Sequence, residues 1–123
     1  MSVQDLYKRK LATAWDAVRL VRDGDQVVVP ISAGEPPGLL AALSERRREF
    51  RDVTVAQMLA MRQYGYFDPS TVEHVRHVSM FFGGASRPGG QERWIDFMPN
   101  NFSEMPAMIE RGDVACDVVF ALA

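Results

Sequence analysis

The residues best placed to do chemistry are Gly34, Glu35 and Pro36, which follow a short run of apolar residues. In α/β proteins, an apolar strand leading through a glycine-containing turn into a helix places backbone N–H groups before an anionic or carbonyl ligand. The turn lacks both the three-glycine spacing of a dinucleotide loop and the Gly-Lys-Ser/Thr of a nucleotide-phosphate loop. The sequence therefore predicts a binding turn for a ligand other than NAD or ATP. A turn chosen only for its geometry is the alternative.

A second candidate is the glycine-rich segment 83–90, which contains Ser86 and Arg87. A hydroxyl beside a guanidinium suits a phosphate or a carboxylate, because both groups donate hydrogen bonds to anionic oxygens. The segment is predicted to be a flexible or ligand-exposed loop. The alternative interpretation is a surface loop that binds nothing.

Other reactive residue types give no site. His74 and His77 would lie on opposite faces of a strand, and no further ligand type is near them, so no metal site is predicted. Cys116 begins a predicted buried strand and is interpreted as a small core residue. The sequence has no Gly-x-Ser-x-Gly turn for a serine nucleophile. The cationic run Arg46–Arg48 is interpreted as the solvated end of a helix, where positive charge suits the helix dipole.

Composition narrows the class of protein. The chain has 123 residues, 47% hydrophobic and 24% charged, which are values of an ordinary globular domain. A net charge of -2 offers no positive field for nucleic acid. The single cysteine allows no internal disulfide. No signal-peptide core is present, and no apolar run approaches the ~20 residues of a membrane span. We therefore expect a soluble, cytoplasmic protein that binds neither nucleic acid nor membrane.

Hydrophobic periodicity predicts alternating strands and helices. Thr13, with Asp16 three residues later, is expected to cap a helix that ends near Val21. A second helix should begin at Pro36 or Pro37, where a missing N–H costs nothing, and end in the charged stretch 45–49; a third should cover 104–111. Strands are predicted at 26–32, 53–59, 77–82, 94–98 and 116–122, with a loop at 62–70.

This order predicts a single α/β domain over residues 1–123, with an open, mostly parallel sheet flanked by helices. An apolar final strand stands where a doubly wound domain normally continues. We therefore expect an incomplete or split domain whose last strand, or one sheet face, packs against further sequence or a partner chain.

The chain resembles the N-terminal part of the acetyl-CoA hydrolase and CoA-transferase family, which includes 4-hydroxybutyrate and succinyl-CoA:acetate CoA-transferases. The resemblance rests on the order and spacing of several short segments rather than on any one of them. These segments are residues 13–27, 34–36, 75–83, 96–99, 102–106 and 117–122.

The resemblance implies a CoA-transferase-like fold, in which two similar open-sheet domains face each other across the active site. It also implies an acyl-CoA or carboxylate substrate, with coenzyme A as part of the substrate and no separate cofactor. A glutamate nucleophile forms an acyl anhydride and then a glutamyl-CoA thioester in that family. That glutamate belongs to the second domain, beyond residue 123, so Glu35 does not inherit its role and no catalytic residue is assigned.

The expected function is therefore the N-terminal domain or small subunit of a CoA-transferase or acyl-CoA hydrolase-like enzyme. Gly34, Glu35, Pro36, Ser86 and Arg87 are the predicted substrate-binding residues. A chain carrying the second domain is the expected partner, in a homo- or hetero-oligomer, and the isolated chain is expected to be inactive. Two alternatives remain: a subunit recruited to other acyl-thioester chemistry, such as decarboxylation or dehydration, and a catalytically silent binding or scaffold subunit.

Departures from the family pattern bear on the substrate. Val78 stands where relatives commonly have Asn, and segment 83–90 is shorter and richer in glycine than theirs. The resemblance therefore leaves the acyl group and its acceptor open.

Overall fold

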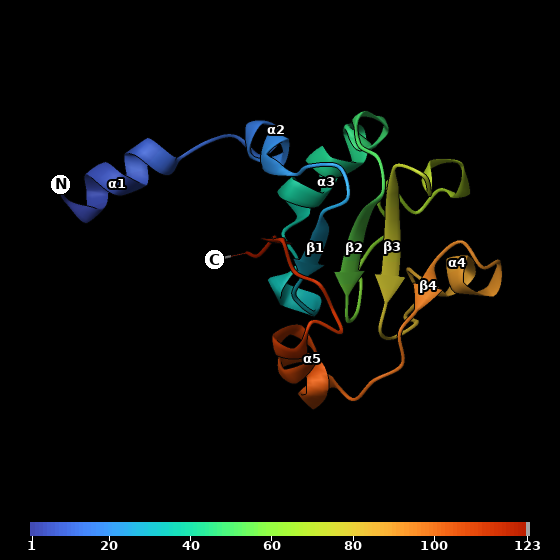
Figure 1. The fold of residues 1–123 in the computed structure, drawn as a ribbon. Coiled ribbons are helices and arrows are strands. Elements are labelled where there is room, and N and C mark those ends of the chain that lie inside the picture. The colour runs from blue at the N-terminus through green and yellow to red at the C-terminus, as the bar shows by residue number, and fades with distance from the viewer. Residues whose placement is uncertain (123) are drawn as a thin grey trace.

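The structure, a computed structural model, describes residues 1–122 and contains an entirely parallel five-stranded sheet with flanking helices (Figure 1). This confirms the predicted α/β class. The strands are β1 Gln26–Val29, β2 Val53–Gln57, β3 Val75–Ser79, β4 Asp96–Phe97 and β5 Val118–Val119. The helices are α1 Val3–Lys10, α2 Ala14–Ala17, α3 Pro37–Glu45, α4 Arg87–Gln91 and α5 Met105–Arg111. No helix in the described part of the chain is long and apolar enough to cross a membrane.

The strand order β4-β3-β2-β1-β5 creates a switch point beside β1. The chain adds β2, β3 and β4 on one side of β1 and then returns to place β5 on the other side. Both neighbours of β1 are parallel to it, so the carboxyl ends of β1, β2 and β5 lie at one edge of the sheet. In open α/β sheets, ligands bind in the crevice outside the carboxyl ends of strands at such a point.

Two apolar clusters pack against the sheet, one on each face. Alternation along β1 sends Val27 and Val29 to one face, where they pack with Leu40 and Leu43 of α3 in the larger core. Val28 points to the opposite face and joins a smaller core rich in methionine. The members of that smaller core, with the side chains packed against it, are Val28, Ala56, Met58, Met80, Met98, Met105, Met108, Ile109 and Val114.

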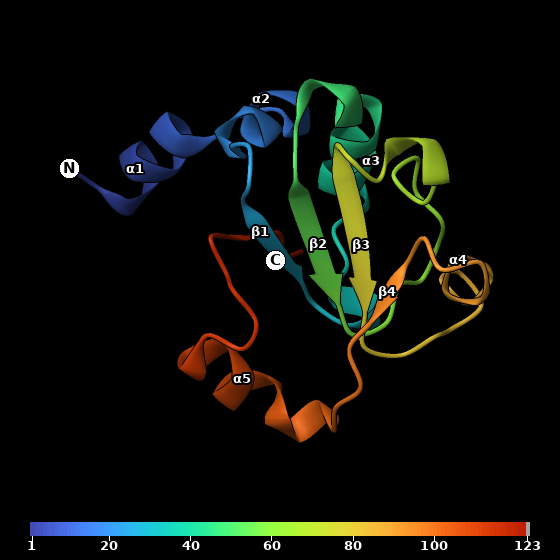
Figure 2. The same ribbon diagram turned by 45° about the vertical axis from the view of Figure 1, so that its right-hand side comes forward.

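The first helix was not predicted. Ser2 and Asp5 form a reciprocal capping box at the start of α1, which is the signal that sequence reasoning passed over. The helix extends away from the sheet in both ribbon views and buries none of its residues (Figure 2). Thr13 caps α2 as predicted, and its hydroxyl accepts a hydrogen bond from the Asp16 N–H at 3.1 Å.

The strands are shorter than predicted. β1 stops at Val29 because Pro30 follows it, and proline has no N–H to donate to a ladder. Ser32–Gly34 then forms a 3₁₀ turn instead of continuing the strand. β3 begins two residues before the predicted start at His77, and β5 pairs through only two residues.

Segment 83–90 is not the predicted flexible loop, because α4 begins within it. Its glycines allow close packing instead of flexibility. A Cβ at Gly90 would lie 2.4 Å from the nearest atom of the Phe82 ring, and a Cβ at Gly89 would lie 2.4 Å from the Ile95 side chain. Both glycines therefore admit an apolar side chain against the helix backbone.

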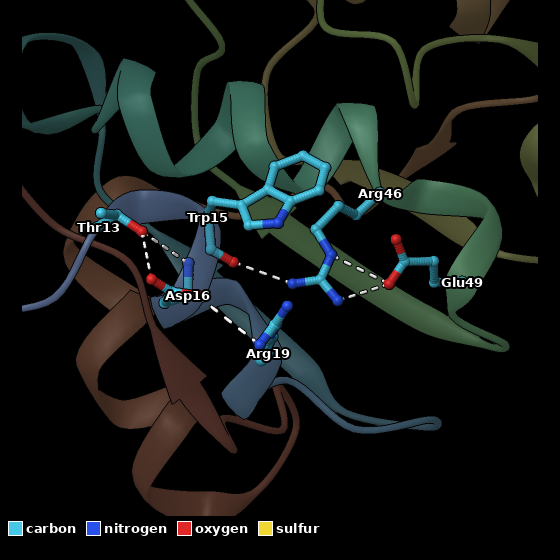
Figure 3. Close-up of polar contacts among 6 residues, drawn as sticks. All are labelled: Thr13, Trp15, Asp16, Arg19, Arg46 and Glu49. Carbon is cyan, nitrogen blue, oxygen red and sulfur yellow. Dashed lines mark hydrogen bonds and ion pairs between the residues drawn. The ribbon is translucent and has the colours of Figure 1, made fainter.

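Two further interpretations of single residues are wrong. Cys116 is exposed, not a core residue, because β5 begins only at Val118. The Arg46 side chain is only 10% exposed, so it is not part of a solvated helix end. Its guanidinium donates hydrogen bonds to the Trp15 carbonyl and to the Glu49 carboxylate (Figure 3). The bond to the Trp15 carbonyl is 2.9 Å long, and the guanidinium carbon lies 5.1 Å from the centre of the Trp15 ring. Arg46 thereby connects α2 to the C-terminal end of α3.

Candidate functional site

The turn after β1 depends on two unusual backbone positions. Ser32 has a φ of 53°, a left-handed backbone conformation that residues other than glycine rarely adopt. A Cβ at Gly34 would lie 2.8 Å from the Pro30 Cβ, so only glycine fits there without displacement. The prolines at 36 and 37 then set the start of α3. The glycine and the two prolines of the turn are thus explained by its geometry.

Glu35 is buried at the centre of this region, with 5% of its surface exposed. Its Oε2 accepts hydrogen bonds from the Gln57 side-chain amide at 2.8 Å and from the Met61 N–H at 2.9 Å. Its Oε1 accepts one from the Tyr64 hydroxyl at 2.6 Å and lies 3.5 Å from the Arg62 Nε. Because both oxygens are satisfied by donors, the carboxylate ties the turn after β1 to the segment after β2.

Tyr64 keeps its proton in this arrangement. Burial raises the pKa of Tyr64 above its ordinary value, and the hydrogen bond to Glu35 raises it further. Its ring stacks on that of Tyr66, with centroids 5.7 Å apart and an angle of 7° between the planes. The phenol is therefore held as a permanent donor to the buried carboxylate.

A pocket of about 260 Å³ opens beside Glu35, at the switch point of the sheet. The segments after β1, β2 and β5 all contribute to it, and the Leu122 N–H donates to the Gly34 carbonyl at 3.1 Å, which holds the end of the chain against the turn. Its lining residues are Ser32, Ala33, Glu35, Pro37, Met61, Arg62 and Leu122. The walls combine the polar residues Ser32, Glu35 and Arg62 with four apolar residues.

Of the predicted binding residues in the turn, Glu35 lines the pocket, whereas Gly34 and Pro36 do not. The N–H groups of Gly34 and Glu35 are not directed at a ligand, because they donate to the carbonyls of Ile31 and Ser32 within the turn. Pro36 has no N–H at all. These three residues therefore offer a ligand no free backbone N–H.

Ser86 and Arg87 do not line this pocket. Ser86 is fully buried, and its hydroxyl lies 3.3 Å from that of Ser79 and 3.4 Å from the Phe81 carbonyl. Arg87 donates to the Phe82 carbonyl at 3.2 Å. Their role as an anion-binding pair stays a prediction. In this conformation the Ser86 hydroxyl is inside the protein.

Sequence reasoning missed Gln57, Met61, Arg62 and Tyr64, which surround Glu35. A usable signal was Gln57, a polar side chain at the end of an otherwise apolar strand. The other three lie in or next to the segment predicted as an irregular loop, where periodicity gives no information about side-chain direction.

The histidines form no site. His77 is buried against the Phe67 ring, with centroids 4.4 Å apart, and burial lowers the pKa of His77 to about 3. His74 Nδ1 lies 2.7 Å from the Phe50 carbonyl. Within the described residues 1–122, no group of three or more His, Cys, Asp or Glu side chains could hold a metal ion.

Comparison with known proteins identifies relatives along the whole domain. Residues 1–122 match the family described as acetyl-CoA hydrolase/transferase N-terminal domain. The chain is 32% identical over 108 residues to a succinyl-CoA:cyclohexane-1-carboxylate CoA transferase of Geobacter metallireducens, covering 88% of this chain and 24% of the relative. It is 30% identical over 118 residues to a 4-hydroxybutyrate coenzyme A transferase of Clostridium kluyveri, covering 96% and 28%. It thus spans about a quarter of these relatives.

Solved structures show the same fold. RipA from Yersinia pestis superimposes with a TM-score of 0.81 at 24% identity, covering 98% of this chain and 30% of that protein. A 4-hydroxybutyrate CoA-transferase from Porphyromonas gingivalis gives a TM-score of 0.61 at 23% identity, covering 98% and 26%. At these identities the likeness is one of fold, and it agrees with the parallel sheet described above.

Proposed function

The chain belongs to the acetyl-CoA hydrolase/transferase family, and from this premise we propose that it contributes one wall of an active site that acts on acyl-CoA thioesters. Its family membership confirms the resemblance drawn from the sequence segments. In this proposal the nucleophilic glutamate is supplied by another domain or chain, which is in keeping with a chain that spans about a quarter of the length of its relatives. The observation that supports this best is the pocket at the switch point between β1 and β5.

Acyl transfer by this route needs two carboxylates and a thioester to be aligned away from water. The glutamate carboxylate attacks the thioester carbonyl, so that an acyl anhydride forms and the CoA thiolate leaves. The thiolate then attacks the glutamyl carbonyl of the anhydride, which forms a glutamyl-CoA thioester and releases the acyl group as a carboxylate. Alignment and water exclusion require two facing walls. The pocket residues of this chain would bind and orient the acyl group on one of them.

In this proposal Glu35 supports the wall of the pocket and takes no part in acyl transfer. A nucleophilic carboxylate must reach the thioester carbonyl, whereas the Glu35 side chain is only 3% exposed and its oxygens accept hydrogen bonds from three protein donors. Freeing Oε1 would break the bond from Tyr64, and the cost of an unmade charged hydrogen bond is about 1.5–3 kcal/mol. Its role in the proposal is to hold Met61, Arg62 and Tyr64 beside the turn.

The first test measures thioester loss from acetyl-CoA in the presence of a carboxylate acceptor and the isolated chain. We expect no turnover above background. Turnover by the chain alone would contradict the proposal that the nucleophile comes from elsewhere.

The second test joins the chain to the part of the Clostridium kluyveri 4-hydroxybutyrate coenzyme A transferase that it does not span. The joined protein is expected to transfer CoA between acetyl-CoA and 4-hydroxybutyrate. Circular dichroism and gel filtration report whether it is folded, and the unmodified transferase is the positive control. A folded joined protein that transfers no CoA would favour a catalytically silent chain.

A further inference from the structure

We infer that α1 is a docking helix, whose apolar face packs on the part of an acetyl-CoA hydrolase/transferase that this chain does not span. That part is either a further domain or a partner chain. The inference rests on the proposed function, which assigns the nucleophile to the same part, and it adds a surface through which the two parts join.

The first argument is that α1 has one apolar face, and this face is exposed. Val3, Leu6 and Tyr7 are three and four residues apart, so they lie on the same side of the helix, and charged residues occupy the other side. Val3 is 85% exposed and Tyr7 is 64% exposed. A helix with one apolar face normally packs it against another surface, and no surface within the described residues 1–122 buries this one.

The second argument is the length of α1. Helices shorter than about 12–15 residues are marginal in water, because the first turn is costly to form, and α1 has eight residues. The capping box of Ser2 and Asp5 offsets only part of that cost. We therefore expect α1 to be stable only where its apolar face is covered.

The third argument is that α1 belongs to the domain of the family. The family match begins at residue 1, and RipA superimposes over 98% of this chain, so the residues left out are too few to make up the helix. The superimposed region is 30% of RipA. In a protein of this fold, the larger part of the molecule is therefore available to cover the helix.

The fourth argument is the side of the sheet from which α1 extends. The helix lies on the β1 side, away from β4 and α4, in both ribbon views (Figures 1 and 2). The outer strand on that side is β5, where Val119 and Leu122 are also exposed. Because the matched domain is N-terminal in its family, the chain of a longer relative continues after β5. That continuation starts on the side of the sheet from which α1 extends.

The test compares hydrogen exchange of the α1 amides in the 123-residue chain and in the chain joined to the remainder of the Clostridium kluyveri transferase. In the 123-residue chain, these amides should exchange nearly as fast as in an unfolded peptide. In the joined protein, their exchange should be slower by about tenfold or more, because the helix must undock before its amides open. Equal exchange in the two folded proteins would overturn the inference. The measurement needs no CoA, so a joined protein that transfers no CoA can still show docking.

Tyr7→Ser tests the apolar face, since tyrosine and serine have similar helix propensities. In the joined protein, this substitution should remove most of the protection of α1, whereas Lys8→Ser, on the charged face, should retain it. In the 123-residue chain, Tyr7→Ser should leave the urea midpoint of unfolding unchanged. A lower midpoint there would show that the face packs within this domain, and the inference would be wrong.

Two other surfaces could cover α1, and each has its own measurement. A dimer of the 123-residue chain on gel filtration, dissociated by Tyr7→Ser, would assign the face to a second copy. Because the last turn is basic, phosphatidylglycerol vesicles are also added to the chain. Slower α1 exchange with vesicles, but not in the joined protein, would assign the face to a membrane surface. Either result would overturn the inference.

If the joined protein does not fold, the chain is mixed with the remainder of the transferase produced as a separate polypeptide. Co-elution of the two on gel filtration, weakened by Tyr7→Ser and not by Lys8→Ser, would support the docking role of α1. Absence of co-elution, or equal co-elution of both variants, would overturn it.

Discussion

Tyr64 donates its phenolic hydrogen to Oε1 of Glu35 over 2.6 Å, which joins the segment after β2 to the turn after β1. The two residues are 29 positions apart in the sequence, and their hydrogen bond connects two of the segments that line the pocket. If the Tyr64 hydroxyl is removed, the Glu35 carboxylate loses one of the hydrogen bonds that compensate for its burial. The stability of the turn and the shape of the pocket should therefore respond together to a change at either residue.

Tyr64→Phe should lower the free energy of unfolding by about 1–2 kcal/mol, less than most charged hydrogen bonds contribute because Tyr64 is partly exposed. Urea unfolding followed by circular dichroism measures this change. Tyr7→Phe, on the exposed face of α1, is the matched control and should stay within about 0.5 kcal/mol of the unsubstituted protein. An equal effect at both positions would contradict the bond to Glu35.

Alkaline pH should destabilise the protein through Tyr66. Burial raises the pKa of Tyr66 well above its ordinary value of 10.0. The folded state therefore holds the phenolic proton more tightly than the unfolded chain. Its contribution to stability is complete below about pH 10 and is lost as pH rises above it.

Urea unfolding between about pH 8 and pH 11 measures this loss. Tyr66→Phe should reduce this loss and leave the part due to Tyr64, whose pKa is also raised. It should cost little at neutral pH, because the buried Tyr66 hydroxyl has no hydrogen-bond partner among the described residues. Tyr7→Phe should keep the full alkaline loss. If the unfolding free energy falls equally with rising pH in all three proteins, Tyr66 does not cause the alkaline loss of stability.

Acid should destabilise the protein through His77. Burial lowers the pKa of His77 from 6.5 to about 3, so the unfolded chain binds the proton more tightly than the folded state. The contribution of neutral His77 is present above about pH 6.5 and falls toward pH 3, by about 1.4 kcal/mol per pH unit.

His77→Phe should remove that dependence, because phenylalanine does not titrate and can pack on Phe67 in the same place. The measurement is the difference in unfolding free energy between variant and unsubstituted protein from about pH 7 to pH 4. His74→Gln alters the other of the two histidines and should retain the acid-side loss. A constant difference across this range for His77→Phe would contradict the assignment.

The sequence was sufficient for elements whose local signals agree with the fold. The buried run at Val27–Val29, the Thr13 cap and the Gly112 stop after α5 were all predictable, because each depends on a few neighbouring residues. The surroundings of Glu35 were not, since Gln57 and Tyr64 reach it only after β1 and β2 have paired.

The glycine content of segment 83–90 led to the wrong prediction of a flexible loop for a related reason. Gly83–Gly90 has the composition of a flexible loop, and only the positions of Phe82 and Ile95 show that glycine is needed for packing. Arg46 is a similar case, because it stands in a run of arginines that is typical of a solvated helix end, whereas its partner Trp15 lies 31 residues away. Long-range contacts of this kind leave no local pattern.

Arg46→Lys should loosen α2. Lysine keeps the charge but cannot donate at once to the Trp15 carbonyl and the Glu49 carboxylate, and it stacks less well on the indole ring. Hydrogen exchange of the α2 amides is expected to speed up, while exchange in β2 stays slow. Arg48→Lys, two residues away on an exposed position, is the control and should change neither. Equal exchange in both variants would show that Arg46 does not hold α2.

Gly90→Ala should destabilise the protein although alanine favours helices. A Cβ at this position would lie 2.4–2.8 Å from three Phe82 ring atoms, so the ring must move and the cost should be about 1–3 kcal/mol. Gly38→Ala is the matched helical control, because nothing lies within 4 Å of a Cβ there. It should stabilise the protein by about 1 kcal/mol through helix propensity alone. Thermal unfolding measures both, and a gain in stability for Gly90→Ala would mean that segment 83–90 is mobile, as its composition suggests, and not packed on Phe82.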